Sequence, residues 1–93
     1  MRKVLVLAGT RPEAIKMAPV VMELRRRSSM RAVLCTTGQH SEMMAQALAD
    51  FGLMPDADLG VMSPGQSLAS LTASLMSALD AFLEAEDPDV VLV

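Results

Sequence analysis

The stretch KVLVLAGTRPEAIKMAPVV, Lys3 to Val21, joins an apolar run to the start of a helix and decides the fold class. In Lys3–Ala8 apolar residues occupy both parities of the strand repeat, which predicts a strand buried on both of its faces. Gly9 ends this run, and the pattern that follows predicts a helix from Thr10 to about Arg27. A buried strand that leads directly into a helix is typical of α/β proteins.

The predicted helix carries local signals at its start and in its middle. Thr10 and Glu13 have the spacing of a capping box, in which each side chain accepts a hydrogen bond from the other residue's amide. Pro12 falls in the first turn, where a missing N–H costs nothing. Pro19 leaves the carbonyl of Ile15 without a partner, so we expect a kink there. The expected buried face consists of Ile15, Ala18, Val21, Met22 and Leu24.

The rest of the chain repeats the alternation of strands and helices. Further strands are expected at Arg31–Thr37, Leu59–Met62 and Asp89–Val93, and helices at Ser41–Phe51 and from a second capping box at Ser63 to about Glu86. The last helix has a stripe that is expected to face the sheet, formed by Leu68, Leu71, Leu75, Leu79 and Phe82. This order predicts a Rossmann-like parallel sheet, which binds its ligands outside the carboxyl ends of the strands.

Length and composition limit the possible functions. The chain has 93 residues, 52% of them hydrophobic, so it is one small domain or part of a larger one. Because it ends on the apolar stretch Asp89–Val93, we expect it to be part of a longer protein. A net charge of −3 and only two aromatic residues argue against nucleic-acid binding. Uninterrupted apolar runs are shorter than the roughly 18 residues of a membrane span, so no membrane association is predicted.

Cysteine and histidine usage limits the chemistry further. Cys35 is the only cysteine, which excludes a disulfide framework and fits a reduced, cytoplasmic setting. His40 is the only histidine and has no carboxylate cluster beside it, so no metal site is predicted. The chain has neither G-x-G-x-x-G nor G-x-x-x-x-G-K-[ST], so dinucleotide and P-loop functions have no support.

The strongest candidate site lies at the end of the first strand. Gly9 allows a ligand to approach the backbone closely, and the helix that begins at Thr10 directs free N–H groups toward that space. Arg11 adds a guanidinium suited to phosphate, and Lys16 follows about 7.5 Å along the helix and roughly 140° around it. These features predict a phosphate site; the alternative is a well-capped helix with two surface cations.

A second group of candidates follows the next predicted strand. Gln39 and His40 come directly after Gly38, so they are candidates to line the same crevice. There His40 would donate a hydrogen bond or transfer a proton. The alternative is that His40 caps the next helix or is simply solvated.

Two motifs resemble those of a known family. GTRPEAIKMAPVV, Gly9 to Val21, resembles the N-terminal signature of the non-hydrolysing UDP-N-acetylglucosamine 2-epimerases, and TGQHSEMM, Thr37 to Met44, resembles their second motif. The later segments Asp56–Met62, Pro64–Leu68 and Pro88–Val93 keep the family's order and spacing. The resemblance covers essentially the whole chain.

The resemblance implies a fold and a reaction. The family has two Rossmann-like domains of the GT-B type with the active site between them, and residues 1–93 would be part of the N-terminal one. Members are cytoplasmic homodimers that interconvert UDP-GlcNAc and UDP-ManNAc for polysaccharide precursors, without a cofactor. The C2 proton is removed, UDP is eliminated, and UDP adds back after protonation from the opposite face. By resemblance, Gly9, Thr10 and Arg11 bind the UDP phosphates and Lys16 is catalytic.

The chain also differs from the family's pattern. Gln39 matches a position at which some members bind a second UDP-GlcNAc as an activator, but Gly65 stands where those members have an arginine. The family's proton-transfer residues follow the segment matched by Asp89–Val93, so the 93 residues alone are expected to be inactive. The alternatives are a hydrolysing 2-epimerase, a GT-B sugar transferase, and a non-catalytic nucleotide-sugar-binding module.

Overall fold

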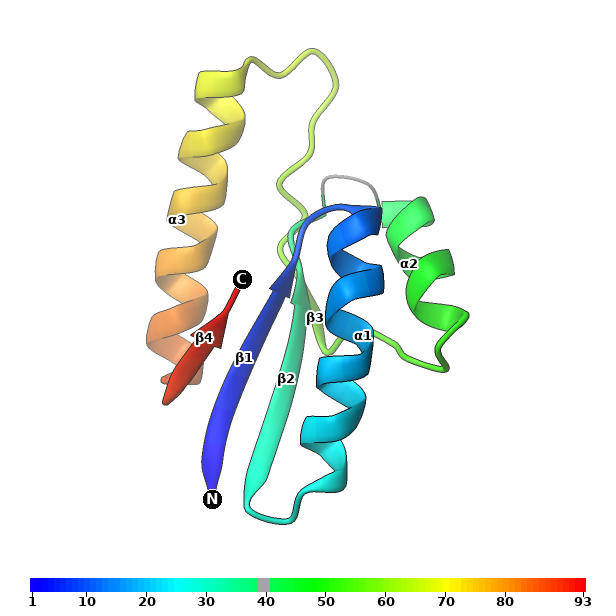
Figure 1. Ribbon diagram of the computed structural model, residues 1–93. Coiled ribbons are helices and arrows are strands. Elements are labelled where there is room, and N and C mark those ends of the chain that lie inside the picture. The colour runs from blue at the N-terminus through cyan, green and yellow to red at the C-terminus, as the bar shows by residue number, and fades with distance from the viewer. Residues whose placement is uncertain (39–40) are drawn as a thin grey trace.

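Four parallel strands form one sheet, with helices packed on both of its faces (Figure 1). The computed structural model describes residues 1–38 and 41–93. The strands are β1 (Arg2–Ala8), β2 (Met30–Thr36), β3 (Ala57–Asp58) and β4 (Val90–Leu92). The helices are α1 (Arg11–Arg26), α2 (Ser41–Ala49) and α3 (Leu68–Glu86). The predicted alternation of strands and helices is confirmed.

The strand order is β3-β2-β1-β4, which is the order of the first four strands in a Rossmann-like sheet. β1 pairs with β2 along its whole length and with β4 over Val4–Val6. From β1 the chain proceeds to β2 and β3 on one side of β1, and it then crosses over to place β4 on the other side. The strand order therefore switches direction at β1. Sheets of this kind bind ligands outside the carboxyl ends of the strands at such a switch point. The predicted α/β, Rossmann-like fold class is confirmed.

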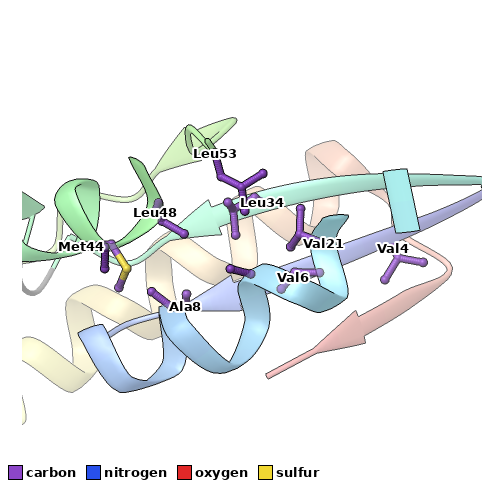
Figure 2. Close-up of a cluster of buried hydrophobic side chains, with 11 residues drawn as sticks. Val4, Val6, Ala8, Val21, Leu34, Met44, Leu48 and Leu53 are labelled. Atoms are coloured by element: carbon purple, nitrogen blue, oxygen red, sulfur yellow. The ribbon is translucent and has the colours of Figure 1, made fainter. Parts of the chain in front are cut away.

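β1 is buried on both faces, as its sequence predicts. Val4, Val6 and Ala8 pack in one cluster with buried side chains from α1, α2 and β2 (Figure 2). Leu5 lies in a second cluster on the opposite face, against which Phe82 of α3 packs. Leu5 and Val6 are fully buried, and burial of one such side chain contributes roughly 1.5–3 kcal/mol. β1 is therefore the centre of the core.

α1 packs through a face rotated from the predicted one. Its buried residues are Ala14, Ala18 and Val21, with Met17 and Leu24 partly buried. Ile15 and Met22 are 46% and 43% exposed, so the prediction that they belong to the core is wrong. One residue corresponds to about 100° around a helix, and the small side chains of Ala14 and Ala18 let this face approach the sheet closely. The helix continues through Pro19 to Arg26.

The loop before α3 departs from its predicted structure. The Gln66 side chain accepts a hydrogen bond from the Ser63 amide at 3.2 Å, which is half of the expected capping box. No helix begins there, because Gly65 adopts a left-handed conformation with a φ of 69°. Ser67 caps α3 instead, and its hydroxyl accepts from the Ser70 amide at 3.0 Å.

α3 contacts the sheet less than predicted. None of its residues is buried; Phe82 and Leu83 near its C-terminal end pack against the core, whereas Leu68 is 80% exposed. The prediction that the whole stripe faces the sheet is wrong, because the three-residue β4 offers little surface to a long helix on that side. Among the helices in the described part of the chain, α3 alone is long and apolar enough to cross a membrane, judged by length and composition only. A count of uninterrupted apolar residues does not select it, because serines, a threonine and the acidic residues Asp80, Glu84 and Glu86 interrupt the run.

Candidate functional site

The carboxyl ends of β1 and β2 meet at one edge of the sheet, where α1 also begins (Figure 1). The Thr37 amide donates to the Ala8 carbonyl at 3.2 Å and ties the two strand ends together. Gly9 is buried directly after β1, Thr10 is partly buried, and Arg11 is exposed as the first residue of α1. These three residues therefore lie at the switch point of the sheet.

The Glu13 carboxylate closes the start of α1, in place of the predicted capping box. Its Oε2 accepts from the Gly9 amide at 2.8 Å, and its Oε1 accepts from the Thr10 hydroxyl at 3.1 Å. Thr10 is the N-cap with an extended backbone, but its side chain caps no amide. The expected reciprocal bonds are wrong because the carboxylate reaches one residue further back along the chain. It therefore occupies a backbone donor that an incoming phosphate would also use.

The Glu13→Ala substitution is expected to lower the free energy of unfolding by about 1 kcal/mol, as the loss of a helix cap does. The substitution leaves the Gly9 amide without its carboxylate partner. Glu13→Gln keeps one side-chain acceptor and is expected to lose less. Urea denaturation measures both changes, with Ala substituted for the exposed Asp50, in the turn directly after α2, as the matched control. Equal stability of Glu13→Ala and the wild type would contradict this role.

Two cations flank the start of α1. Arg11 lies in its first turn and Lys16 in its second, and both are exposed. Within the described part of the chain, neither forms an ion pair or a side-chain hydrogen bond. Helix geometry separates them by roughly 140° around the axis, so a ligand that contacts both must cross the helix start. Their charges are thus not neutralised by a salt bridge to any residue in the ranges 1–38 and 41–93.

The loop after β3 encloses the end of β2. β3 is Ala57–Asp58 and ends directly before the predicted strand Leu59–Met62. The predicted position of this strand is therefore wrong. The Asp58 carboxylate accepts from the Thr36 hydroxyl at 3.0 Å and from the Gly60 amide at 2.7 Å. Asp58 was not among the predicted site residues, although an aspartate two residues before a glycine is a turn signal.

The remaining candidate groups add no reactive centre. Gln39 and His40, predicted to line the crevice, lie outside the residues that the structure describes. Residues 1–38 and 41–93 hold no group of three potential metal ligands. Burial, followed by the charges of Asp58 and Glu86, raises the pKa of Cys35 to about 11. Its thiol is therefore protonated at neutral pH and a poor nucleophile.

Comparison with known proteins shows one consistent relationship. The profile of a family described as UDP-N-acetylglucosamine 2-epimerase matches residues 22–93. A probable UDP-N-acetylglucosamine 2-epimerase of Ralstonia nicotianae is 52% identical over 93 residues, which is all of this chain and 25% of the relative. A crystal structure of UDP-N-acetylglucosamine 2-epimerase superposes with a TM-score of 0.92 at 42% identity, over 99% of this chain and 26% of that one.

A third relative carries a ligand. The crystal structure of the UDP-GlcNAc 2-epimerase from Neisseria meningitidis bound to UDP-GlcNAc matches with a TM-score of 0.87 and 47% identity, over 96% of this chain and 24% of that chain. This chain therefore spans about a quarter of the length of its relatives. The resemblance and the four-stranded parallel sheet found here agree with the fold of that portion.

Proposed function

We propose, from the premise that this chain belongs to the UDP-N-acetylglucosamine 2-epimerase family, that it forms the start of an enzyme that interconverts UDP-GlcNAc and UDP-ManNAc. Residues 1–93 would be the first part of the N-terminal domain of a two-domain, GT-B-like protein. The experiments below use the long form, defined as a polypeptide of the relatives' length that begins with these 93 residues.

The observation that carries the proposal is the cationic helix start at the switch point of the sheet. Gly9, Thr10 and Arg11 place the start of α1 and a guanidinium at the edge where Rossmann-like sheets bind ligands. A phosphate that uses the Gly9 amide would displace the Glu13 carboxylate from it. The similarity to the epimerases includes this segment, since the match to the Ralstonia relative covers all 93 residues. A diphosphate is the part of a nucleotide sugar that such a site would hold.

The proposed reaction makes use of these cations. Removal of the C2 proton and cleavage of the C1–O bond releases UDP and leaves 2-acetamidoglucal; protonation from the opposite face and return of UDP give the C2 epimer. Negative charge grows on the diphosphate as the C1–O bond breaks. We assign Arg11 to binding the diphosphate and Lys16 to stabilising its developing charge, a contribution larger in the transition state than in the ground state.

The register of β4 indicates where further groups would enter the site. Leu92 lies opposite Val6, so residues that follow Val93 in the long form would come level with Ala8 and Gly9 within a few positions. From the family resemblance, we expect the first of the proton-transfer residues in the segment that follows Val93. The proposal therefore assigns phosphate binding to residues 1–93 and expects the 93-residue chain alone to be inactive.

The test is product analysis of the long form in deuterated water. Incubation with UDP-GlcNAc is expected to yield UDP-ManNAc that carries deuterium at C2, because the group that protonates the opposite face has exchanged its own proton with the solvent. Release of free ManNAc and UDP would instead support a hydrolysing 2-epimerase. Transfer of the sugar to an acceptor would support a GT-B transferase, and binding of UDP-GlcNAc without conversion would support a non-catalytic module.

The proposal extends to assembly and location. We expect the long form to be a cytoplasmic homodimer that uses no cofactor or metal and acts in the synthesis of cell-surface polysaccharide precursors. Light scattering is expected to give twice the mass of one chain. The proposed activator role of Gln39 requires rates that rise with UDP-GlcNAc concentration in a sigmoidal manner, and Gly65 in place of the family's arginine weighs against it.

A further inference from the structure

The chain after β3 continues alongside the end of β2 beyond the two-residue strand. The Leu59 amide donates to the Thr36 carbonyl at 2.8 Å, and the Val61 amide donates to the Thr37 carbonyl at 3.1 Å. These bonds hold the segment Asp58–Val61 against the carboxyl end of β2. The segment therefore forms a wall at the edge of the sheet where the candidate site lies.

The Asp58 carboxylate fixes the shape of this wall. One oxygen, Oδ2, accepts from the Thr36 hydroxyl at 3.0 Å, while Oδ1 accepts from the Gly60 amide at 2.7 Å. Thr36 is 2% exposed, so the first of these bonds joins the wall to a buried residue of the sheet. Both carboxylate oxygens of the exposed Asp58 thus accept a hydrogen bond from the protein.

Gly38 shows how closely the wall presses on the end of β2. A side-chain Cβ built at this position would lie 2.7 Å from Asp58 Oδ1 and 2.7 Å from both the nitrogen and the Cα of Gly60. Gly38 also adopts a φ of 88°, in the left-handed region that favours glycine. Only a residue without a side chain fits here, and the position of Asp58 therefore sets the path of the backbone as it leaves β2.

A short chain of bonds connects this position to the start of α1. Thr37, next to Gly38, donates its amide to the carbonyl of Ala8, and Ala8 directly precedes Gly9. We propose that Asp58 is a positioning residue for the proposed nucleotide-sugar site, which holds the end of β2 in register with the Gly9–Arg11 segment. The inference rests on the proposed function for the identity of the ligand, and it assigns no proton transfer to Asp58.

The decisive comparison is between Asp58→Ala and Asp58→Asn in the long form. Alanine removes both hydrogen bonds, and a displacement of about 1 Å in a site is enough to cost up to about 100-fold. Asparagine restores both links: its oxygen accepts from Gly60, and its amide group donates to Thr36, whose hydroxyl then turns to the Ala57 carbonyl, 3.4 Å away. We expect the Kd for UDP to rise about tenfold in the alanine variant and to stay within about threefold of wild type in the asparagine variant.

The readout separates positioning from a loss of folded protein. Calorimetry reports the Kd of the folded fraction, whereas unfolded chains lower only the binding stoichiometry. Thr36→Val, which removes one of the two bonds, supplies a second variant should Asp58→Ala fail to fold, and is expected to raise the Kd about threefold. Asp50→Ala, at an exposed position in the turn directly after α2, is the matched control and is expected to bind as the wild type does.

Three results would overturn the inference. The first is a wild-type Kd for UDP in Asp58→Ala. The second, should Asp58→Ala fail to fold, is a wild-type Kd in Thr36→Val. The third is an Asp58→Asn variant that binds UDP as weakly as Asp58→Ala, which would show that the charge matters and not the hydrogen bonds. Failure of the proposed function looks different: a wild-type long form that binds UDP but does not convert UDP-GlcNAc. In that case the Asp58 series still decides the positioning role.

Discussion

Replacement of Lys16 by methionine is expected to lower the kcat of the long form for UDP-GlcNAc epimerisation by about 100-fold, equal to about 2.7 kcal/mol. Methionine keeps the unbranched shape of lysine and removes the charge that would stabilise the departing diphosphate. Lys16 is exposed and forms no ion pair with the described residues, so its removal strands no partner. The free energy of unfolding is therefore expected to change by less than about 0.5 kcal/mol.

Initial rates over a range of UDP-GlcNAc concentrations measure this effect. Arg26→Met is the matched control, because Arg26 is also an exposed cation on α1 but lies at its opposite end. Its ion pair with Glu23 is exposed and contributes little. A Lys16→Met variant with the kcat of the wild type would exclude Lys16 from the chemical step.

The Arg11→Ala substitution is expected to raise the Kd of the long form for UDP by about 30-fold. Charge-assisted hydrogen bonds contribute about 1.5–3 kcal/mol each, and a guanidinium binds phosphate through two of them. Arg11→Lys keeps the charge but not the planar pair of donors, so an intermediate Kd is expected. The wild-type affinity should also fall with added salt, since Arg11 is exposed to solvent.

Isothermal calorimetry with UDP measures this series, and uridine serves as the ligand control because it lacks the phosphates. Arg11→Ala is expected to leave the weak affinity for uridine unchanged. Arg26→Ala controls for a general loss of positive charge. An unchanged UDP affinity in Arg11→Ala would show that the start of α1 is only a capped helix with surface cations, which is the alternative that the residues themselves left open.

Prediction from sequence was most accurate for β1 and least accurate for α3. The short, valine- and leucine-rich run Lys3–Ala8 favours a strand covered on both faces, and the structure has such a strand there. The leucine stripe of α3 has the correct period, but periodicity states only that a face is apolar and not what covers it. Leu68 is therefore 80% exposed although its spacing is that of a core residue.

The site was predicted in the same uneven way. Gly9, Thr10 and Arg11 could be placed at the end of β1 because strand, glycine and helix start are adjacent in sequence. Asp58 could not, since its bond to Thr36 joins residues 22 positions apart and depends on where two loops meet. Local sequence patterns do not show which distant residues the fold brings into contact, so they could not predict this hydrogen bond.

The sequence by itself determined the fold class and the family, and it predicts the location of the site. These follow from local signals: the change of hydrophobic period from strand to helix, the glycine that ends β1, and motifs of contiguous residues. Only the tertiary structure decided which face of α1 is buried, that Glu13 bonds to the Gly9 amide, and that Asp58 joins the wall after β3 to β2. The physical reason is that a rotation of about 100° or a shift of one residue exchanges these partners without altering the pattern.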